Sequence, residues 1–297
     1  MADAILIGEC MVELGLDGAG QAAVGYGGDT FNTAVYLSRL GVRASYATAV
    51  GRGDPFSAGI LDLMAAEGIG PELVVQAPGR LPGLYAIHRD SAGERSFYYW
   101  REQSPARDYM ALADGAALQA ALDGAKIIYL SAITLAVLGE GGRADLMSRL
   151  LQATQAGAGL MLDTNYRVPL WPDAGVAREA IEALAPRCRF ISAGEQDLRG
   201  LGLDPEAAAL GWAGHGAEVV LRREDRHVEV FDQVRRSLFT PEPPVAAVDT
   251  TGAGDSFNAA YLAARLAGEG IATAVARARS LAVRVVQHRG AIIPRDL

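Results

Sequence analysis

The most informative stretch of this sequence reads Val248-Asp249-Thr250-Thr251-Gly252-Ala253-Gly254-Asp255-Ser256-Phe257-Asn258. It follows a proline-rich connection and precedes an apolar stretch, residues 259–267, without proline or glycine, so we expect a loop that leads into a helix. Gly252 and Gly254 allow the backbone to take a positive φ or to lie close to a ligand. The first N–H groups of the helix, together with its dipole, would then form a site for an anion.

Asp255 falls in the first turn of the expected helix, beside this anion site. A carboxylate there can cap backbone N–H groups, or it can accept the proton of a hydroxyl that attacks a phosphoryl group. A short Gly-x-Gly-Asp pattern alone favours capping, because short motifs often occur by chance. The longer run of nine residues, 249–257, resembles the second signature of the ribokinase (phosphofructokinase B) family of sugar kinases. This longer match favours the catalytic role.

The composition is that of a globular protein of 297 residues, long enough for one large domain or for two. Its 27 Lys and Arg against 35 Asp and Glu give a net charge of −8, which argues against nucleic-acid binding. A local group of arginines can still bind an anionic substrate. The two cysteines, Cys10 and Cys188, have no metal-like spacing and fit a reducing cytoplasm. We expect no membrane span and no signal peptide, because apolar runs are short and the N-terminus lacks a basic region.

Short apolar runs predict a series of buried strands, with turns and helices between them. The expected strands are residues 4–7, 44–50, 126–131, 159–163, 189–192, 219–221 and 227–231. Strands that alternate with helices favour a doubly wound, mostly parallel sheet flanked by helices, an α/β fold. We expect one domain over residues 1–297.

Two segments, at about residues 10–25 and 83–102, break this alternation, and each is expected to form a β-hairpin. Their turns are expected at residues 17–18 and 90–94. The second hairpin carries five aromatic residues and Arg101, more than solvent exposure explains. It is either a sheet that packs against another subunit or a lid that holds Tyr85, Tyr99 and Arg101 over a substrate. The hairpin can serve both purposes if one face of its sheet covers the substrate and the opposite face contacts another subunit. We therefore expect a homo-oligomer formed through the lid.

Polar residues gather at two further places. Gly28 precedes an expected helix on which Asp29 and Asn32 lie one turn apart, and such a pair can bind sugar hydroxyls. The alternative is that Asp29 only caps the helix. Arg167 follows the strand that ends at Asp163, where open α/β sheets bind ligands. Its planar guanidinium suits a carboxylate or phosphate, and the alternative is a surface ion pair.

The resemblance to the ribokinase family extends over nearly the whole chain, and within the family it is strongest to the kinases of 2-keto-3-deoxygluconate. It implies transfer of a phosphoryl group, dependent on ATP and Mg²⁺, to the primary hydroxyl of a keto sugar acid in the cytoplasm. It implies that Asp255 is the base and that the N–H groups of Gly252, Ala253 and Gly254 stabilise the phosphoryl group. The sugar-acid site that it implies consists of Gly28, Asp29, Asn32, Tyr85, Tyr99, Arg101 and Arg167.

The nucleotide side departs from the family pattern at two points. The family's Asn-x-x-Glu element matches Ser192 to Glu195, so that Glu195 is retained and Ser192 replaces the Asn. The resemblance assigns both residues to ATP, Glu195 also to Mg²⁺ through water, and Ala291 to the adenine. The usual glycine-rich turn is free of glycine at residues 222–226. Arg223 in this turn either contacts phosphate or belongs to a solvated charged turn.

Three functions remain open at this point. Arg101 and Arg167 favour a kinase of a sugar acid, and a kinase of a neutral sugar such as fructose, or of a nucleoside, is the alternative. The glycine-free turn motivates a third function, a non-catalytic sugar-binding protein, against which Asp255 argues. The sequence also leaves open whether a monovalent cation binds near Asp249.

Overall fold

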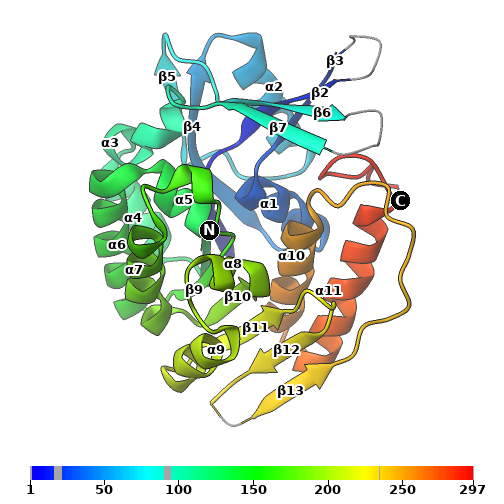
Figure 1. The fold of residues 1–297 in the computed structure, drawn as a ribbon. Coiled ribbons are helices and arrows are strands. Elements are labelled where there is room, and N and C mark those ends of the chain that lie inside the picture. The colour runs from blue at the N-terminus through cyan, green and yellow to red at the C-terminus, as the bar shows by residue number, and fades with distance from the viewer. Residues whose placement is uncertain (1, 17–21, 90–94, 234, 297) are drawn as a thin grey trace.

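The computed structural model describes residues 2–16, 22–89, 95–233 and 235–296. In this part of the chain a nine-stranded sheet forms the centre, in the order β13-β12-β11-β10-β9-β8-β1-β4-β5 (Figure 1). The strands from β11 to β5 in this order are all parallel, and β12 pairs antiparallel with β11 on one side and with β13 on the other. The nine strands are β1 (Ala4–Ile7), β4 (Ala44–Arg52), β5 (Val74–Pro78), β8 (Ile127–Ser131), β9 (Gly159–Asp163), β10 (Phe190–Gly194), β11 (Glu218–Arg222), β12 (Val228–Phe231) and β13 (Arg236–Phe239).

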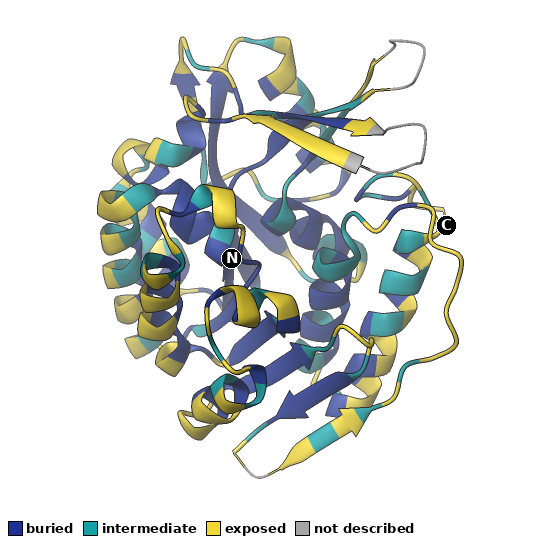
Figure 2. Ribbon diagram, in the orientation of Figure 1, coloured by how far each residue is buried: buried dark blue, intermediate teal, exposed yellow. Residues whose placement is uncertain are grey.

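Helices cover both faces of this sheet, whose strands are mostly buried (Figure 2). Two clusters of buried apolar residues lie between the sheet and the helices, one on each face. One face is covered by α1 (Asp29–Arg39), α2 (Pro55–Ala66), α10 (Ala253–Leu266) and α11 (Ile271–Val286). The other is covered by α3 (Tyr109–Leu112), α4 (Gly115–Asp123), α5 (Ala132–Val137), α6 (Gly139–Gln155), α7 (Ala174–Leu184), α8 (Glu195–Gly200) and α9 (Pro205–Gly214). Three short 3₁₀ helices lie at η1 (Pro105–Asp108), η2 (Val168–Leu170) and η3 (Ala185–Arg187). The prediction of a doubly wound, mostly parallel α/β fold is confirmed.

A second, small sheet has the order β3-β2-β6-β7 and lies across one end of the large sheet (Figure 1). Its strands are β2 (Met11–Leu16), β3 (Ala22–Gly27), β6 (Leu84–Arg89) and β7 (Arg95–Trp100). β2 with β3, and β6 with β7, form the two antiparallel pairs that the sequence predicts, and parallel pairing of β2 with β6 joins them. The turns expected at residues 17–18 and 90–94 lie outside the described residues.

Candidate active site

A cavity of about 1130 Å³, here called the large cavity, opens where the parallel strands end and the small sheet lies over them. β1 stands between β4 and β8 in the sheet, so the chain winds in opposite directions on its two sides. Crevices at such a switch point, outside the carboxyl ends of the strands, are where open α/β sheets bind ligands. The large cavity therefore lies at the position expected of a functional site.

The N-terminus of α10 lies at one wall of this cavity. Gly252 precedes the helix with φ 77°, a left-handed conformation that favours glycine. A Cβ on Gly252 would lie 2.7 Å from the carbonyl oxygen of Ala291, so the position has no room for a side chain. Within the described chain no side chain caps α10. The N–H of Ala253 donates a long hydrogen bond of 3.3 Å to the carbonyl of Thr250, and without a side-chain cap this helix start can accept an anion.

Asp255 lies in the first turn of α10 and lines the large cavity. One of its carboxylate oxygens accepts a hydrogen bond of 2.8 Å from the side-chain amide of Asn32. Burial raises the pKa of Asp255 well above its ordinary value, the charge of Asp29 adds to this, and the hydrogen bond from Asn32 opposes it. A carboxylate with a raised pKa is a stronger proton acceptor, which suits a general base.

Three aspartates meet at the base of the large cavity, and each accepts a hydrogen bond from an asparagine on another element. The pairs are Asn32 to Asp255 at 2.8 Å, Asn165 to Asp29 at 3.0 Å, and Asn258 to Asp163 at 2.9 Å. Burial raises the pKa of Asp163 to about 6, and the Arg222 guanidinium acts in the opposite direction. The N-cap position of α1 is occupied by Gly28, and Asp29 is the first residue of the helix. The carboxylate of Asp29 therefore does not cap the helix, and it accepts the hydrogen bond from Asn165.

The large cavity brings together every residue that the sequence assigned to the sugar acid. Those residues are Gly28, Asp29, Asn32, Tyr85, Tyr99, Arg101 and Arg167. Gly28 allows two segments to touch, because a Cβ there would lie 2.1 Å from the carbonyl oxygen of Glu9. The rings of Tyr85 and Tyr99 lie 5.9 Å apart and belong to paired positions of the small sheet.

The arginines at this end of the cavity differ in their partners. Arg101 forms a buried ion pair with Glu9, which the sequence analysis did not single out. Arg167 is exposed, and Arg107 of η1, which was also missed, is partly exposed. Within the described residues neither Arg107 nor Arg167 forms a salt bridge. The unbalanced positive charge therefore comes from Arg107 and Arg167, because Glu9 neutralises Arg101.

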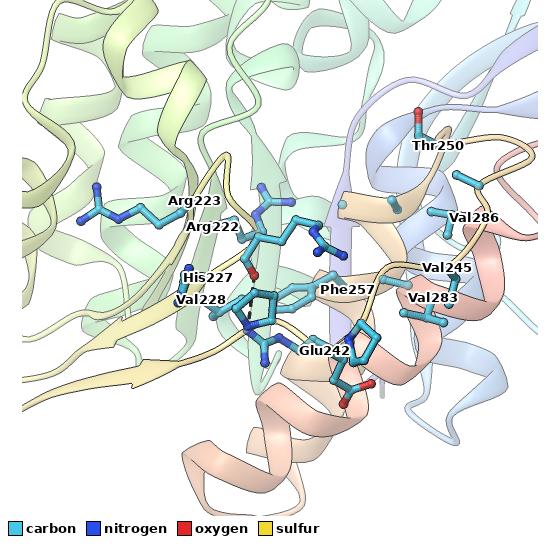
Figure 3. Close-up of a pocket in the computed structure, with 18 residues that line it drawn as sticks. Arg222, Arg223, His227, Val228, Glu242, Val245, Thr250, Phe257, Val283 and Val286 are labelled. Carbon is cyan, nitrogen blue, oxygen red and sulfur yellow. Dashed lines mark hydrogen bonds between the residues drawn. The ribbon is translucent and has the colours of Figure 1, made fainter.

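A second cavity of about 390 Å³, the small cavity, lies between the turn after β11, the loop 241–250 and the helices α10 and α11 (Figure 3). Much of its wall is apolar, with Val245, Phe257, Val283 and Val286 among the lining residues. The two cavities share four lining residues, namely Arg222, Arg223, Thr250 and Gly254. They therefore meet at the N-terminus of α10, beside Asp255.

Glu195 and Arg223 hold the glycine-free turn in place. Glu195 accepts hydrogen bonds from the side chains of Arg199 and Arg223 and from the backbone N–H of Glu224. Arg223 also pairs with Glu229, and in the close-up it points away from the other labelled side chains (Figure 3). Arg223 also lines both cavities, so a contact with phosphate stays a prediction.

Two residues that the sequence assigned to the nucleotide, Ser192 and Ala291, are buried and contact other parts of the protein. Ser192 is 1% exposed and donates a hydrogen bond of 2.6 Å to the side chain of Asn258. Ala291 packs against Gly252, and its carbonyl accepts a hydrogen bond from the hydroxyl of Tyr36. Neither Ser192 nor Ala291 is among the described residues that line the two cavities. In this structure the side chains of Ser192 and Ala291 pack inside the protein, and their contact with the nucleotide stays a prediction.

Arg222 is the residue of this region that the sequence analysis missed. It ends β11 and forms a salt bridge of 3.0 Å with Asp163, which ends β9. The signal was present, because Arg222 stands at the carboxyl end of a parallel strand just as Arg167 follows one. Among the described residues, no group of three or more His, Cys, Asp or Glu side chains is arranged to hold a metal ion. In the same residues no helix is both long enough and apolar enough to cross a membrane.

A doubly wound sheet with an uncapped helix N-terminus, a neighbouring carboxylate and two joined cavities defines a phosphotransferase that acts on a hydroxyl group. The chain belongs to the pfkB family of carbohydrate kinases, whose family model matches residues 1–296.

Individual relatives agree over nearly the full length. The chain is 37% identical over 299 residues to a 2-dehydro-3-deoxygluconokinase of Dickeya dadantii (strain 3937), covering 97% of this chain and 96% of that protein. A crystal structure of a PfkB protein from Polaromonas sp. JS666 superposes with a TM-score of 0.85 at 26% identity, covering 97% of this chain and 96% of that one. A putative ribokinase II from E. coli, solved with ATP and Mg²⁺, has the same fold, with a TM-score of 0.81 at 21% identity and 98% and 94% coverage.

Proposed function

We propose that the protein transfers the terminal phosphoryl group of ATP to the primary hydroxyl of 2-keto-3-deoxygluconate, giving 2-keto-3-deoxy-6-phosphogluconate. The observation that carries this proposal is the junction of the two cavities at the N-terminus of α10, next to Asp255. The 2-dehydro-3-deoxygluconokinases at 37% identity support the choice of substrate.

In this reaction the hydroxyl oxygen of the sugar attacks the terminal phosphorus, and Asp255 accepts the proton of that hydroxyl. The bond from that phosphorus to the bridging oxygen breaks, and ADP leaves with the electron pair. The N–H groups at residues 252–254, at the N-terminus of α10, stabilise the charge that develops on the transferred group. Asn32 holds the Asp255 carboxylate in place throughout.

The carboxylate of the substrate binds at the end of the large cavity where Arg107 and Arg167 carry positive charge. Arg101 faces the same space but is paired with Glu9, so it contributes shape and hydrogen bonds more than net charge. Asp29 and Asn32, which line the same cavity, bind the sugar hydroxyls: the carboxylate of Asp29 accepts hydrogen bonds and the amide of Asn32 can donate them. Tyr99 closes the cavity from β7.

The small cavity fits an adenosine, because Phe257 and several valines offer it an apolar wall next to the anion site. Mg²⁺ bound together with ATP would neutralise part of the charge of the phosphates. Glu195 fits contact with a water bound to Mg²⁺ better than direct ligation, because its two oxygens already accept three hydrogen bonds. We also propose a monovalent cation near Asp249, a buried carboxylate whose donors include the neutral groups of Thr251 and Gly290.

The chain is one domain in this proposal, and the small sheet, residues about 10–25 and 83–102, is its lid. Residues in β7 alternate between two faces, and Phe97 and Tyr99 line the large cavity. Tyr98 and Trp100 face the other way, where they are 53% and 59% exposed. A second copy of the chain would cover this outer face, so that the lid also forms a homodimer. The ATP requirement and the two free, buried cysteines support a cytoplasmic location.

The test is a coupled assay of ADP release with ATP at fixed Mg²⁺ over a panel of acceptors. We expect turnover of 2-keto-3-deoxygluconate and little or none of fructose, ribose and adenosine. Turnover of fructose without any sugar acid would overturn the substrate assignment. Heat stabilisation by the sugar acid, with neither stabilisation by an ATP analogue nor turnover, would replace the kinase with a sugar-binding protein.

A further inference from the structure

We propose that Arg222 is a catalytic residue whose guanidinium contacts the phosphoryl group during its transfer, and that Asp163 is the positioning residue that aims it. This inference rests on the kinase function proposed above. It concerns the side chain that stands where the two cavities join.

The first observation is the place of the guanidinium. Its Nη1 lies 2.7 Å from the point where a Cβ on Gly254 would stand, so it lies against the first turn of α10. Any side chain at residue 254 would displace it. The glycine therefore keeps a cation next to the N–H groups that are proposed to bind the phosphoryl oxygens, one residue before Asp255.

The second observation is how the side chain is held. Its Nη2 donates a hydrogen bond of 3.0 Å to Asp163, which is 2% exposed and is itself held by Asn258. Within the described residues Nη1 has no hydrogen-bond partner, and Nε is buried without one. One edge of the guanidinium is thus fixed while other donors remain for an oxygen anion, the arrangement that suits a phosphoryl group.

The third observation is the contrast with the next residue. Arg223 also lines both cavities, but its guanidinium nitrogens are paired with the carboxylates of Glu195, Glu206 and Glu229. Adjacent residues of a strand point to opposite sides, so the chain directs one arginine to the site and one to the surrounding network. Of these two arginines, Arg222 is the one whose guanidinium lies against the first turn of α10.

The electrostatics explain why a cation is needed at this point. Asp29, Asp163 and Asp255 gather at the base of the large cavity, and the terminal phosphate of ATP adds further negative charge. A fixed cation beside the phosphoryl group stabilises the charge on the phosphoryl oxygens more strongly in the transition state than in the ground state, and it thereby lowers the barrier. Its loss should therefore reduce kcat far more than it weakens the binding of either substrate.

The experiment compares Arg222→Leu and Arg222→Lys with Arg236→Leu. Arg236 is a matched control, because it is also a paired arginine on this edge of the sheet but pairs with Glu229 and Glu206 away from both cavities. We expect kcat for the sugar acid to fall by about 10²–10³-fold in Arg222→Leu, to recover in part in Arg222→Lys, and to be unchanged in Arg236→Leu. The KM values for ATP and sugar acid should change by less than about threefold.

A binding measurement separates the transition state from the ground state. In the wild type, fluoroaluminate should tighten the binding of ADP in the presence of the sugar acid and Mg²⁺, because it mimics the group in transfer. Arg222→Leu should keep its affinity for ADP alone and lose this tightening. Asp163→Asn should lower kcat in the wild-type background and cause no further loss in Arg222→Leu, as expected of a residue that acts through Arg222.

A kcat within about threefold of wild type in Arg222→Leu, or a loss confined to the KM for ATP, would overturn the inference. If Arg222→Leu does not fold, Arg222→Lys decides, since unchanged kcat and unchanged fluoroaluminate binding would contradict a contact that depends on the guanidinium. A wild-type protein that phosphorylates no sugar acid would instead refute the proposed function. An active wild type with an unaffected Arg222 variant refutes this inference alone.

Discussion

The side-chain amide of Asn32 donates a hydrogen bond of 2.8 Å to the carboxylate of Asp255, although 223 residues separate the two in the chain. Asn32 is 4% exposed on α1, and Asp255 opens α10, so the bond ties together the N-terminal turns of two packed helices. The other carboxylate oxygen of Asp255 accepts no hydrogen bond from the described residues. This oxygen is the one that the mechanism gives to the sugar hydroxyl.

Replacing Asp255 with Asn removes the proposed base and keeps the size of the side chain. We expect kcat to fall by about 10³-fold while the sugar acid and ATP still bind with near-normal affinity. Steady-state kinetics and calorimetric titration measure the two quantities separately. A variant with a near-normal rate would exclude Asp255 as the base.

The pH dependence of kcat/KM should report the pKa of Asp255. Because the base must be ionised, activity is lost as the pH falls through this pKa, which burial places well above its ordinary value. Asp29→Asn removes a neighbouring negative charge, so the acidic limb should move to lower pH. Asn32→Leu removes the hydrogen bond that lowers the pKa, so the limb should move to higher pH. Shifts in the same direction for both variants would contradict the assignment of the limb.

Arg101 and Arg167 should respond differently to truncation. Arg101→Ala leaves the buried carboxylate of Glu9 without its cation, which costs about 3–5 kcal/mol in the free energy of unfolding. Arg167→Ala should raise the KM for the sugar acid with little change in stability, because its side chain is exposed. Denaturant unfolding and initial rates test this, and a stable Arg101→Ala variant would show that the pair with Glu9 is weak. Adding Glu9→Gln to Arg101→Ala should recover part of the lost stability.

The outer face of the lid should control the oligomeric state. Trp100→Asp places a charge on an apolar, 59% exposed position, and we expect it to convert a dimer to a monomer in sedimentation experiments. Leu238→Asp is the control, because Leu238 on β13 is equally exposed and lies on the large sheet. A wild-type protein that is monomeric at micromolar concentration would refute the proposed dimer.

Much of the fold could be predicted from the sequence because its signals are local. The glycines before Asp255 mark the start of α10, and the apolar runs mark the parallel strands. β5 and β13 were missed, because edge strands have few buried apolar residues to reveal them, as the alternating exposure of β13 illustrates. The seven residues assigned to the sugar acid line one cavity. Each of them either follows the end of a strand or belongs to a hairpin of the small sheet, which lies over that end of the large sheet.

The remaining site residues depend on long-range geometry. Glu9 and Arg101 are 92 positions apart, so their pairing follows only from the folded chain. Arg222 and Arg223 are adjacent, and which of them faces the site depends on the direction of alternate side chains at the end of β11. The sequence does not reveal that direction, and its pattern singled out Arg223 without Arg222. Ser192 was likewise expected at the nucleotide, whereas its side chain points into the core toward Asn258.

The most direct test of the account is a crystal structure of the protein with a non-hydrolysable ATP analogue, Mg²⁺ and 2-keto-3-deoxygluconate. We predict terminal phosphoryl oxygens at hydrogen-bond distance, about 3 Å, from the backbone N–H groups at residues 252–254, with the sugar's primary hydroxyl equally close to Asp255. A terminal phosphoryl group bound away from the N-terminus of α10, or a primary hydroxyl remote from Asp255, would contradict it.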